Sequence, residues 1–384
     1  MKRKILVFAA FYSPAVKGGG PIQSIKNLVD NLSDENDFYI ITSDRDLGDH
    51  TPFSDINFNT WVNVGNAHVC YLDTQKTKLS NFISLINSVD YDLIYLNSFF
   101  SFRYSILPII LYKTKYITVK PIILAPRGEF SLGALKLKKT KKNLYIFLAK
   151  LLSMYNNVLW QGTASEEKND ILRVFGEKAN VMVASNLTAD YSGLEYTKNI
   201  EKNRGSIKII FLSRIHPKKN LKQALLFLSK VNGKVEFNIY GPIEDTAYWT
   251  DCEEIISNFP PNILVSYKGV VKHEDIIEIF REHHIFLFPT LGENFGHVIF
   301  EALIGGCPLI ISDQTPWRNL EGQGIGFDIE LSNDNKFIEK IQYFIEMSKE
   351  ELEIYSKKSF YFGKNYSRKN NSYLEMKNIL SLFD

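Results

Sequence analysis

The amino-acid sequence predicts an α/β protein built from two tandem doubly wound, Rossmann-like domains that face a cleft. Two observations predict this class. Short apolar runs alternate with segments of helical periodicity along nearly the whole chain, which is typical of parallel strands joined by crossover helices. The chain of 384 residues is also too long for one ordinary core, and a polar stretch without a sustained period divides the alternation in two.

The first domain is predicted over residues 1–186. Its opening, MKRKILVFAAFYSPA, joins a basic start to a short apolar run and so resembles a signal peptide. The run is short and a glycine-rich loop follows it, which favours a buried first strand. Strands are predicted at 4–11, 37–43, 68–72, 92–98, 121–126 and 157–163, and helices at 21–33, 79–88, 101–116, 135–153 and 164–174.

A linker is predicted at 187–206 and the second domain at 207–348, where the same alternation returns. The tail at 349–384 has a helical pattern, and we expect it to pack back towards the N-terminal domain. Strands of the second domain are predicted at 207–213, 235–241, 263–269, 284–290, 308–312 and 324–329, and helices at 219–231, 246–257, 273–281, 296–305 and 333–346.

Composition narrows the classes of partner and site. The 45 lysine and arginine residues nearly balance the 43 aspartate and glutamate residues, so no nucleic-acid partner is expected. Cys70, Cys252 and Cys307 are widely scattered, which fits a reducing compartment and argues against a disulfide framework or a cysteine zinc site. The reducing compartment that the cysteines indicate makes a cytoplasmic protein the expectation. No run reaches the roughly 18 apolar residues that a membrane span requires.

The loops that follow the strands are the places to look for a site, because ligands of open α/β sheets bind beyond the carboxyl ends of the strands. PTLGENFGHVIFEALIGGCPLI, residues 289–310, places Glu293 on such a loop and Glu301 inside the next helix. Gly296 lets a ligand approach a helix start that favours anions. The two carboxylates would grip opposite ends of a nucleotide-sugar, or they are an ordinary helix charge and a surface glutamate.

Basic residues follow another strand of the second domain, in FLSRIHPKKNL. Arg214 and Lys219 are a natural pair for a diphosphate, and the alternative is a solvated basic loop that includes Lys218. The glycine-rich SPAVKGGGPIQS at 13–24 lacks the dinucleotide fingerprint. APRGEF places Arg127 and Glu129 after a strand, where contact with a sugar, contact with an acceptor and a surface ion pair all stay open.

Two further features are a segment that is basic and then apolar, and a pair of adjacent histidines. ALKLKKTKKNLYIFLAKLLSMY, residues 134–155, is either a helix packed on the first domain with a solvated basic end, or a segment that rests on an anionic membrane. His283 and His284 are expected at a helix end, where the dipole favours a protonated imidazole.

Taken together, these motifs resemble the retaining glycosyltransferases of the family-4 type, which have the GT-B fold. The resemblance covers nearly the whole chain. It rests on the tandem α/β pattern, on LSRIHPKKN, and on Glu293 and Glu301 separated by seven residues within ENFGHVIFEALIGGCPLI. SDQTPWRNL at 312–320 is similar to a segment of bacterial members that build surface polysaccharides.

The resemblance implies a role for each matching position. Arg214 and Lys219 would hold the donor diphosphate, Glu301 the ribose, and Glu293 the hydroxyls of the donor sugar. Many members carry a histidine where this chain has Arg127, so the donor and the role of Arg127 stay open. The other positions implied to contact the donor are Gly19, Gly20, Val271, Asn294, Phe295, Gly296, Val298 and Ile299.

The implied activity is transfer of a hexosyl or N-acetylhexosaminyl group, with retention, from a nucleotide-sugar to a glycan or lipid-linked acceptor in polysaccharide assembly. UDP is the expected nucleotide, and no metal or other cofactor is expected. A lipid-linked acceptor would place the enzyme on the inner face of the cell membrane. A nucleotide-sugar epimerase of GT-B fold and a non-catalytic sugar- or nucleotide-binding protein remain as alternatives.

Overall fold

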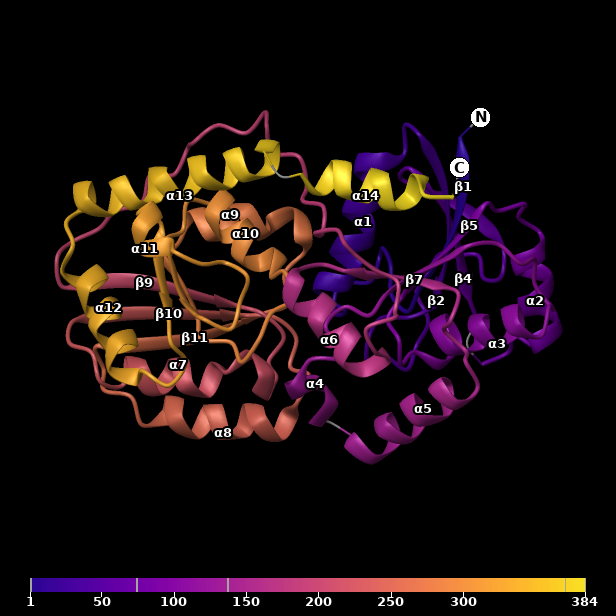
Figure 1. The fold of residues 1–384 in the computed structure, drawn as a ribbon. Helices are drawn as coiled ribbons and strands as arrows, with labels where there is room; N and C mark the ends of the chain where they lie inside the picture. Colours follow the sequence, from indigo (N-terminus) through magenta and orange to yellow (C-terminus); the bar gives the residue numbers. More distant parts are fainter. Residues whose placement is uncertain (1, 74, 137, 370, 384) are drawn as a thin grey trace. The chain divides into compact units, whose positions relative to one another are not determined.

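A computed structural model describes residues 2–73, 75–136, 138–369 and 371–383. The chain divides into two compact units (Figure 1), of which unit 1 comprises Met1–Ala189 and Asn371–Asp384, and unit 2 comprises Asp190–Asn370. Each unit has a mostly or wholly parallel sheet with helices on both faces. The predicted class of two doubly wound α/β domains is therefore confirmed.

Unit 1 is built on a sheet with the strand order β3-β4-β2-β1-β5-β6-β7-β8. Adjacent strands run parallel, and β3 pairs with β4 antiparallel. Leu6 of β1 lies between Tyr39 of β2 and Ile94 of β5, so the first apolar run is a central strand. The strands are β1 (Arg3–Ala9), β2 (Asn36–Ser43), β3 (Trp61–Val64), β4 (Ala67–Leu72), β5 (Leu93–Asn97), β6 (Ile122–Ala125), β7 (Val158–Gly162) and β8 (Val181–Val183).

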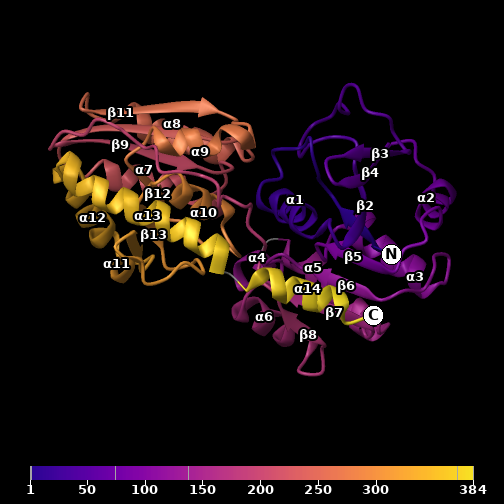
Figure 2. The same ribbon diagram turned by 90° about the horizontal axis from the view of Figure 1, so that it is seen from above.

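Successive residues of a strand point to opposite faces of the sheet, and in this sheet both faces are apolar. Helices therefore cover both faces. Val7 points to the face where Ile25 of α1 and Met376 of α14 pack, and Phe8 points to the face where Phe82 of α2 packs. Figure 2 shows α1 and α2 on opposite sides of the strands. The helices are α1 (Gly20–Leu32), α2 (Leu79–Asn87), the π-helical turn η1 (Phe102–Ile106), α3 (Leu107–Lys113), α4 (Leu132–Lys136), α5 (Lys139–Leu151), α6 (Ser165–Phe175) and α14 (Ser372–Ser381).

Unit 2 has a parallel sheet with the strand order β11-β10-β9-β12-β13-β14. Its strands are β9 (Ser206–Leu212), β10 (Lys234–Tyr240), β11 (Ile263–Gly269), β12 (Ile285–Phe288), β13 (Leu309–Ser312) and β14 (Gly326–Ile329). Its helices are η2 (Pro217–Lys219), α7 (Leu221–Leu228), α8 (Thr246–Ser257), η3 (His273–Asp275), α9 (Ile276–Arg281), α10 (His297–Ile304), α11 (Leu320–Gln323), α12 (Asp334–Glu346) and α13 (Lys349–Lys369).

The polar stretch between the two alternating halves packs into unit 2 from residue 190 onward. Lys198 is buried there, and its ammonium donates to the carbonyl oxygens of Gly306 at 2.8 Å and Phe280 at 3.3 Å. The chain returns to unit 1 after α13, since Met376 and Ile379 of α14 are buried against Ile25 and Leu28 of α1. The two halves of the C-terminal tail therefore belong to different units.

Candidate functional site

The charged residues predicted for the second domain lie at the carboxyl edge of its sheet. Arg214 and Lys219 follow β9, and Glu293 lies on the loop after β12. The two loops are fastened to each other, because the Asn220 side-chain amide donates to the Pro289 carbonyl at 2.9 Å and the Leu291 amide donates to the Lys218 carbonyl at 2.9 Å. Adjacent parallel strands thus bring residues far apart in sequence to one edge.

Lys219 and Glu293 form an ion pair between Nζ and Oε1 at this edge. Their side chains are 13% and 12% exposed, so the pair is largely withdrawn from water. The Lys219 ammonium lies 5.6 Å from the ring centroid of Phe288, and the Thr290 hydroxyl donates to Glu293 Oε1 at 3.3 Å. The cation predicted for the diphosphate and the carboxylate predicted for the sugar therefore neutralise each other in the structure.

Arg214 pairs with Glu244, a residue that the sequence did not single out. Arg214 Nη1 lies 2.7 Å from Glu244 Oε2, and both side chains are about one third exposed. Gly241 brings the end of β10 against the loop after β9, since a Cβ there would lie 1.9 Å from the Ser213 carbonyl oxygen. Glu244 was detectable in the sequence, because it follows the strand predicted at 235–241 as closely as Glu293 follows its own strand.

Glu301 lies in the second turn of α10 and is buried. Its burial raises the pKa of this carboxyl to about 8. His273 Nδ1, on η3 after β11, lies 3.6 Å from Glu301 Oε1. Burial and the nearby Glu301 both raise the pKa of the Tyr191 hydroxyl. His273 and Tyr191 thus border the carboxylate predicted for the ribose, and neither was a predicted site residue.

The start of α10 is held by glycine and by a tryptophan. Gly296 has φ of 77°, and a Cβ there would lie 2.8 Å from Ile299 Cδ1, so a larger residue would be strained. The Trp317 indole N–H donates to the Phe295 carbonyl at 2.6 Å, which ties the SDQTPWRNL segment to this loop. The first amides of a helix lack intrahelical acceptors and favour an anion, although the Ile299 amide already donates to the Gly296 carbonyl.

The remaining predicted donor contacts are distributed over both units. Asn294 and Val298 are half-buried beside Gly296, and Val271 packs partly buried against the core of unit 2 between β11 and η3. Gly19 has φ of 67° and directly precedes α1, of which Gly20 is the first residue. Gly19 and Gly20 therefore belong to unit 1, and the others belong to unit 2.

Arg127 and Glu129 are engaged inside unit 1. Arg127, at φ of 57°, donates from Nε to Asn97 Oδ1 at 2.8 Å and from Nη2 to the Tyr95 hydroxyl at 2.9 Å, and its Nη1 donates to Asn186. Glu129 accepts hydrogen bonds from the Ser98 hydroxyl at 2.8 Å and from the backbone amides of Phe99 and Phe100. Burial raises the pKa of Glu129 although these hydrogen bonds act in the opposite direction. Both side chains hold the strand-end loops of unit 1 together.

The two histidines after α9 lie where the sequence predicts, but the prediction that they are protonated is wrong. His283 and His284 do follow α9, but burial lowers their pKa values to about 4 and about 3. His284 Nδ1 accepts the Lys208 amide at 2.7 Å, which leaves its Nε2–H to donate to the Glu201 carbonyl at 3.0 Å. Desolvation therefore outweighs the helix dipole, and these residues are neutral parts of the core.

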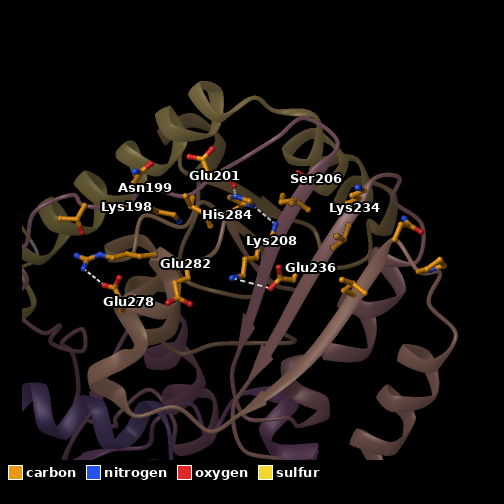
Figure 3. Close-up of a pocket in the computed structure, with 18 residues that line it drawn as sticks. Lys198, Asn199, Glu201, Ser206, Lys208, Lys234, Glu236, Glu278, Glu282 and His284 are labelled. Carbon is orange, nitrogen blue, oxygen red and sulfur yellow. Dashed lines mark hydrogen bonds and ion pairs between the residues drawn. The ribbon is translucent and has the colours of Figure 1, made fainter.

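A pocket of about 850 Å³ lies at the opposite, amino edge of the same sheet (Figure 3). Lys208 and Lys234 face it from the beginnings of β9 and β10, together with Glu236 and Glu282, so charges of both signs line it. Lys208 Nζ lies 3.7 Å from Glu236 Oε1. None of the predicted site residues lines this pocket. Among the described residues, no three His, Cys, Asp or Glu side chains are placed to hold a metal ion.

Comparison with known proteins shows which family a part of the chain resembles and which fold the whole chain has. Residues 194–359 match the family described as glycosyl transferases group 1. A curated relative is an uncharacterised 41.2 kDa protein in the cps region of Klebsiella pneumoniae, which is 24% identical over 209 residues. That match covers 53% of this chain and 56% of the relative, so the chain spans little more than half the relative's length.

Solved structures match almost the full chain. Sucrose-phosphate synthase from Thermosynechococcus elongatus superposes with a TM-score of 0.73 at 14% identity, covering 99% of this chain and 98% of that one. Anabaena HepE, solved in complex with UDP and glucose, superposes with a TM-score of 0.67 at 15% identity, covering 99% of each chain. TM-scores of this size over almost the full chain establish the fold, and the predicted GT-B fold with two Rossmann-like domains is confirmed.

Proposed function

We propose that this chain, whose residues 194–359 match the glycosyl transferases group 1 family, transfers a sugar from a nucleotide-sugar to a glycan or lipid-linked acceptor in polysaccharide assembly. The observation that carries the proposal is the carboxyl edge of unit 2, where Arg214 and Lys219 lie on the loop beside a glycine-started helix. Two cations and the N-terminus of a helix, whose dipole favours negative charge, are a matched set for a diphosphate. The relative in the cps region supports the polysaccharide context.

The donor we propose is a UDP-sugar carrying a hexosyl or N-acetylhexosaminyl group. Its diphosphate would replace Glu293 as the ion-pair partner of Lys219 and would replace Glu244 as that of Arg214. Glu293 could then accept hydrogen bonds from the sugar hydroxyls. Glu301 would accept hydrogen bonds from the ribose, with Val271 near the base. The complex of HepE with UDP and glucose supports the choice of nucleotide. No metal or other cofactor enters this proposal.

The proposed reaction breaks the bond between the anomeric carbon and the diphosphate oxygen and forms a bond from that carbon to the acceptor oxygen. The acceptor proton passes to an oxygen of the departing diphosphate. Arg214, Lys219 and the start of α10 stabilise the charge that develops on this leaving group. Attack on the face that the diphosphate leaves retains the configuration. The enzyme would act in the cytoplasm, at the inner face of the membrane when its acceptor is lipid-linked.

The test is a calorimetric screen of nucleotide-sugars combined with detection of released products, with Lys219→Ala and Glu301→Ala beside the parent. We expect one donor to bind, both variants to weaken it, and the parent to release free nucleotide slowly. NMR of the transferred sugar then reports the anomeric configuration. A folded parent that binds no nucleotide-sugar would refute the site. Tight binding without transfer or hydrolysis would refute the activity, and isomerisation of the donor sugar would identify an epimerase.

A further inference from the structure

The outer face of α5 is apolar, which is the reverse of an ordinary exposed helix. Leu144, Phe147, Leu148 and Leu151 are 60%, 61%, 42% and 67% exposed. Their spacing of three and four residues places them on one side of the helix, and we call this set the α5 face. Leu152, which directly follows the helix, is 66% exposed beside it.

The opposite side of α5 fixes the helix to unit 1. Ala149 is buried in the core, and the ring of Tyr145 lies 5.3 Å from that of Phe99. The hydroxyls of Tyr145 and Tyr155 lie 2.5 Å apart. The helix is therefore anchored through one face, and the α5 face takes no part in the core that anchors it.

Positive charge surrounds the α5 face. Residues 130–165 contain six lysines and no aspartate or glutamate. Lys142 turns towards the protein, where its ammonium donates to the Ala134 carbonyl at 2.8 Å and lies 4.8 Å from the Phe100 ring centroid. The other five are exposed, and within the part of the chain that the structure describes none of them forms an ion pair; they are Lys136, Lys138, Lys139, Lys141 and Lys150. Of these, Lys150 has its ammonium 5.8 Å from the Phe175 ring centroid.

We propose that the α5 face docks on the surface of an anionic lipid bilayer. A continuous apolar stripe of this kind is uncommon on a protein surface that faces only water. Aliphatic and aromatic side chains rimmed by unpaired lysines match the boundary between acyl chains and anionic headgroups. No helix in the described ranges is long and apolar enough to cross a bilayer, so the contact is peripheral.

This inference deepens the proposed function by naming the surface that would bring the enzyme to a lipid-linked acceptor. Only the biological role of the membrane contact rests on the proposed function. The observations that support the contact itself lie in unit 1 and involve no residue proposed to bind the donor. A protein partner or a second copy of the chain would also cover apolar side chains. The crowding of unpaired lysines at the beginning of α5 favours anionic headgroups over both.

The test is flotation of the full-length protein with vesicles of phosphatidylcholine alone and of phosphatidylcholine with phosphatidylglycerol. We expect binding to the anionic vesicles that weakens with salt. The variant Leu144→Ser/Phe147→Ser/Leu151→Ser should bind at least about tenfold more weakly. Lys138→Glu/Lys139→Glu/Lys141→Glu should lose a similar factor on anionic vesicles. A matched control, Leu79→Ser/Ile354→Ser/Leu374→Ser, removes equally exposed apolar side chains from other helices and should bind as the parent does.

Circular dichroism confirms that each variant is folded, and calorimetry with UDP separates the two proposals. Loss of vesicle binding with unchanged nucleotide affinity supports the α5 face. Vesicle binding without any nucleotide binding would leave the face supported and the donor site refuted. Binding that is equal on both vesicle types, or equal in parent and serine variant, would overturn the inference. So would sedimentation showing a dimer that the serine variant converts to monomer.

Discussion

The two sheets carry charged residues at their carboxyl edges, but they use them differently. In unit 1, Arg127 and Glu129 each make several hydrogen bonds to neighbouring strand ends, so moving either would leave buried polar groups without partners. In unit 2, Lys219 and Arg214 each pair with one carboxylate, Glu293 and Glu244. A single partner can be exchanged for another anion. The difference supports our proposal that the first edge serves stability and that the second serves a ligand.

The largest expected effect is on catalysis, from Lys219→Ala. Removing a cation that stabilises a departing diphosphate should lower kcat by about 10²- to 10³-fold. Steady-state release of the nucleotide from the donor measures it. A residual rate within a few-fold of the parent would show that Lys219 takes no part in the reaction. It would also contradict the ligand-binding role proposed for the carboxyl edge of unit 2.

Glu301→Gln should remove a pH dependence of stability. The pKa of Glu301 is raised from 4.5 to about 8, so between these values the folded state binds a proton that the unfolded state has released. The free energy of unfolding therefore falls as pH rises through this window, on the order of 1.4 kcal/mol per pH unit, and levels off above it. His283 and His284, whose pKa values are lowered, act in the opposite direction below about pH 6.5. Urea unfolding of the parent should therefore show the Glu301 slope between about pH 6.5 and 8. An equal slope in Glu301→Gln would assign it to another group.

Arg127→Ala should cost stability without affecting nucleotide binding. Loss of the guanidinium strands the oxygens of Asn97, Asn186 and Tyr95, which we expect to cost about 2 kcal/mol. Arg214→Ala is the matched control, since its partly exposed pair should change stability by less than about 1 kcal/mol. Urea unfolding of both variants gives the comparison. Similar losses in the two would erase the distinction between the edges.

The smallest expected effect is that of Gly296→Ala. The left-handed backbone and the close Ile299 side chain should make alanine cost about 1 kcal/mol and weaken UDP binding a few-fold. Gly193→Ala serves as control, because a Cβ there meets nothing within 4 Å. Thermal unfolding and calorimetry measure both. Unchanged UDP affinity in Gly296→Ala would remove the start of α10 from the site.

The sequence predicts the sheets well, because buried parallel strands are continuous apolar runs. β2, β11 and β13 lie within one residue of their predicted bounds. β3 and β8 were missed, since Trp61–Val64 is interrupted by a polar residue and Val181–Val183 is too short to stand out. The helix predicted at 101–116 is divided into η1 and α3, a change of hydrogen-bond pattern that hydrophobic periodicity does not register.

The site was less predictable than the sheets, because pairing between loops depends on strand order. The strand-end rule selects Arg214, Lys219 and Glu293, but it does not show that Lys219 meets Glu293 or that Arg214 meets Glu244. The protonation of His283 was predicted wrongly. Its place at a helix end indicates a favourable dipole, but β10 and β12 bury the side chain, and burial lowers its pKa. Local sequence gives the candidates, and the topology gives their partners.

The central claim has two parts. The carboxyl edge of unit 2 binds the nucleotide, and Arg127 with its hydrogen-bond partners in unit 1 stabilises the fold. Calorimetric titration of UDP into the parent, Arg214→Ala and Arg127→Ala tests it most directly. We predict that Arg214→Ala weakens UDP by about tenfold or more, through loss of a charge-assisted contact, and that folded Arg127→Ala binds as the parent does. Unchanged affinity in Arg214→Ala together with lost affinity in folded Arg127→Ala would contradict the account.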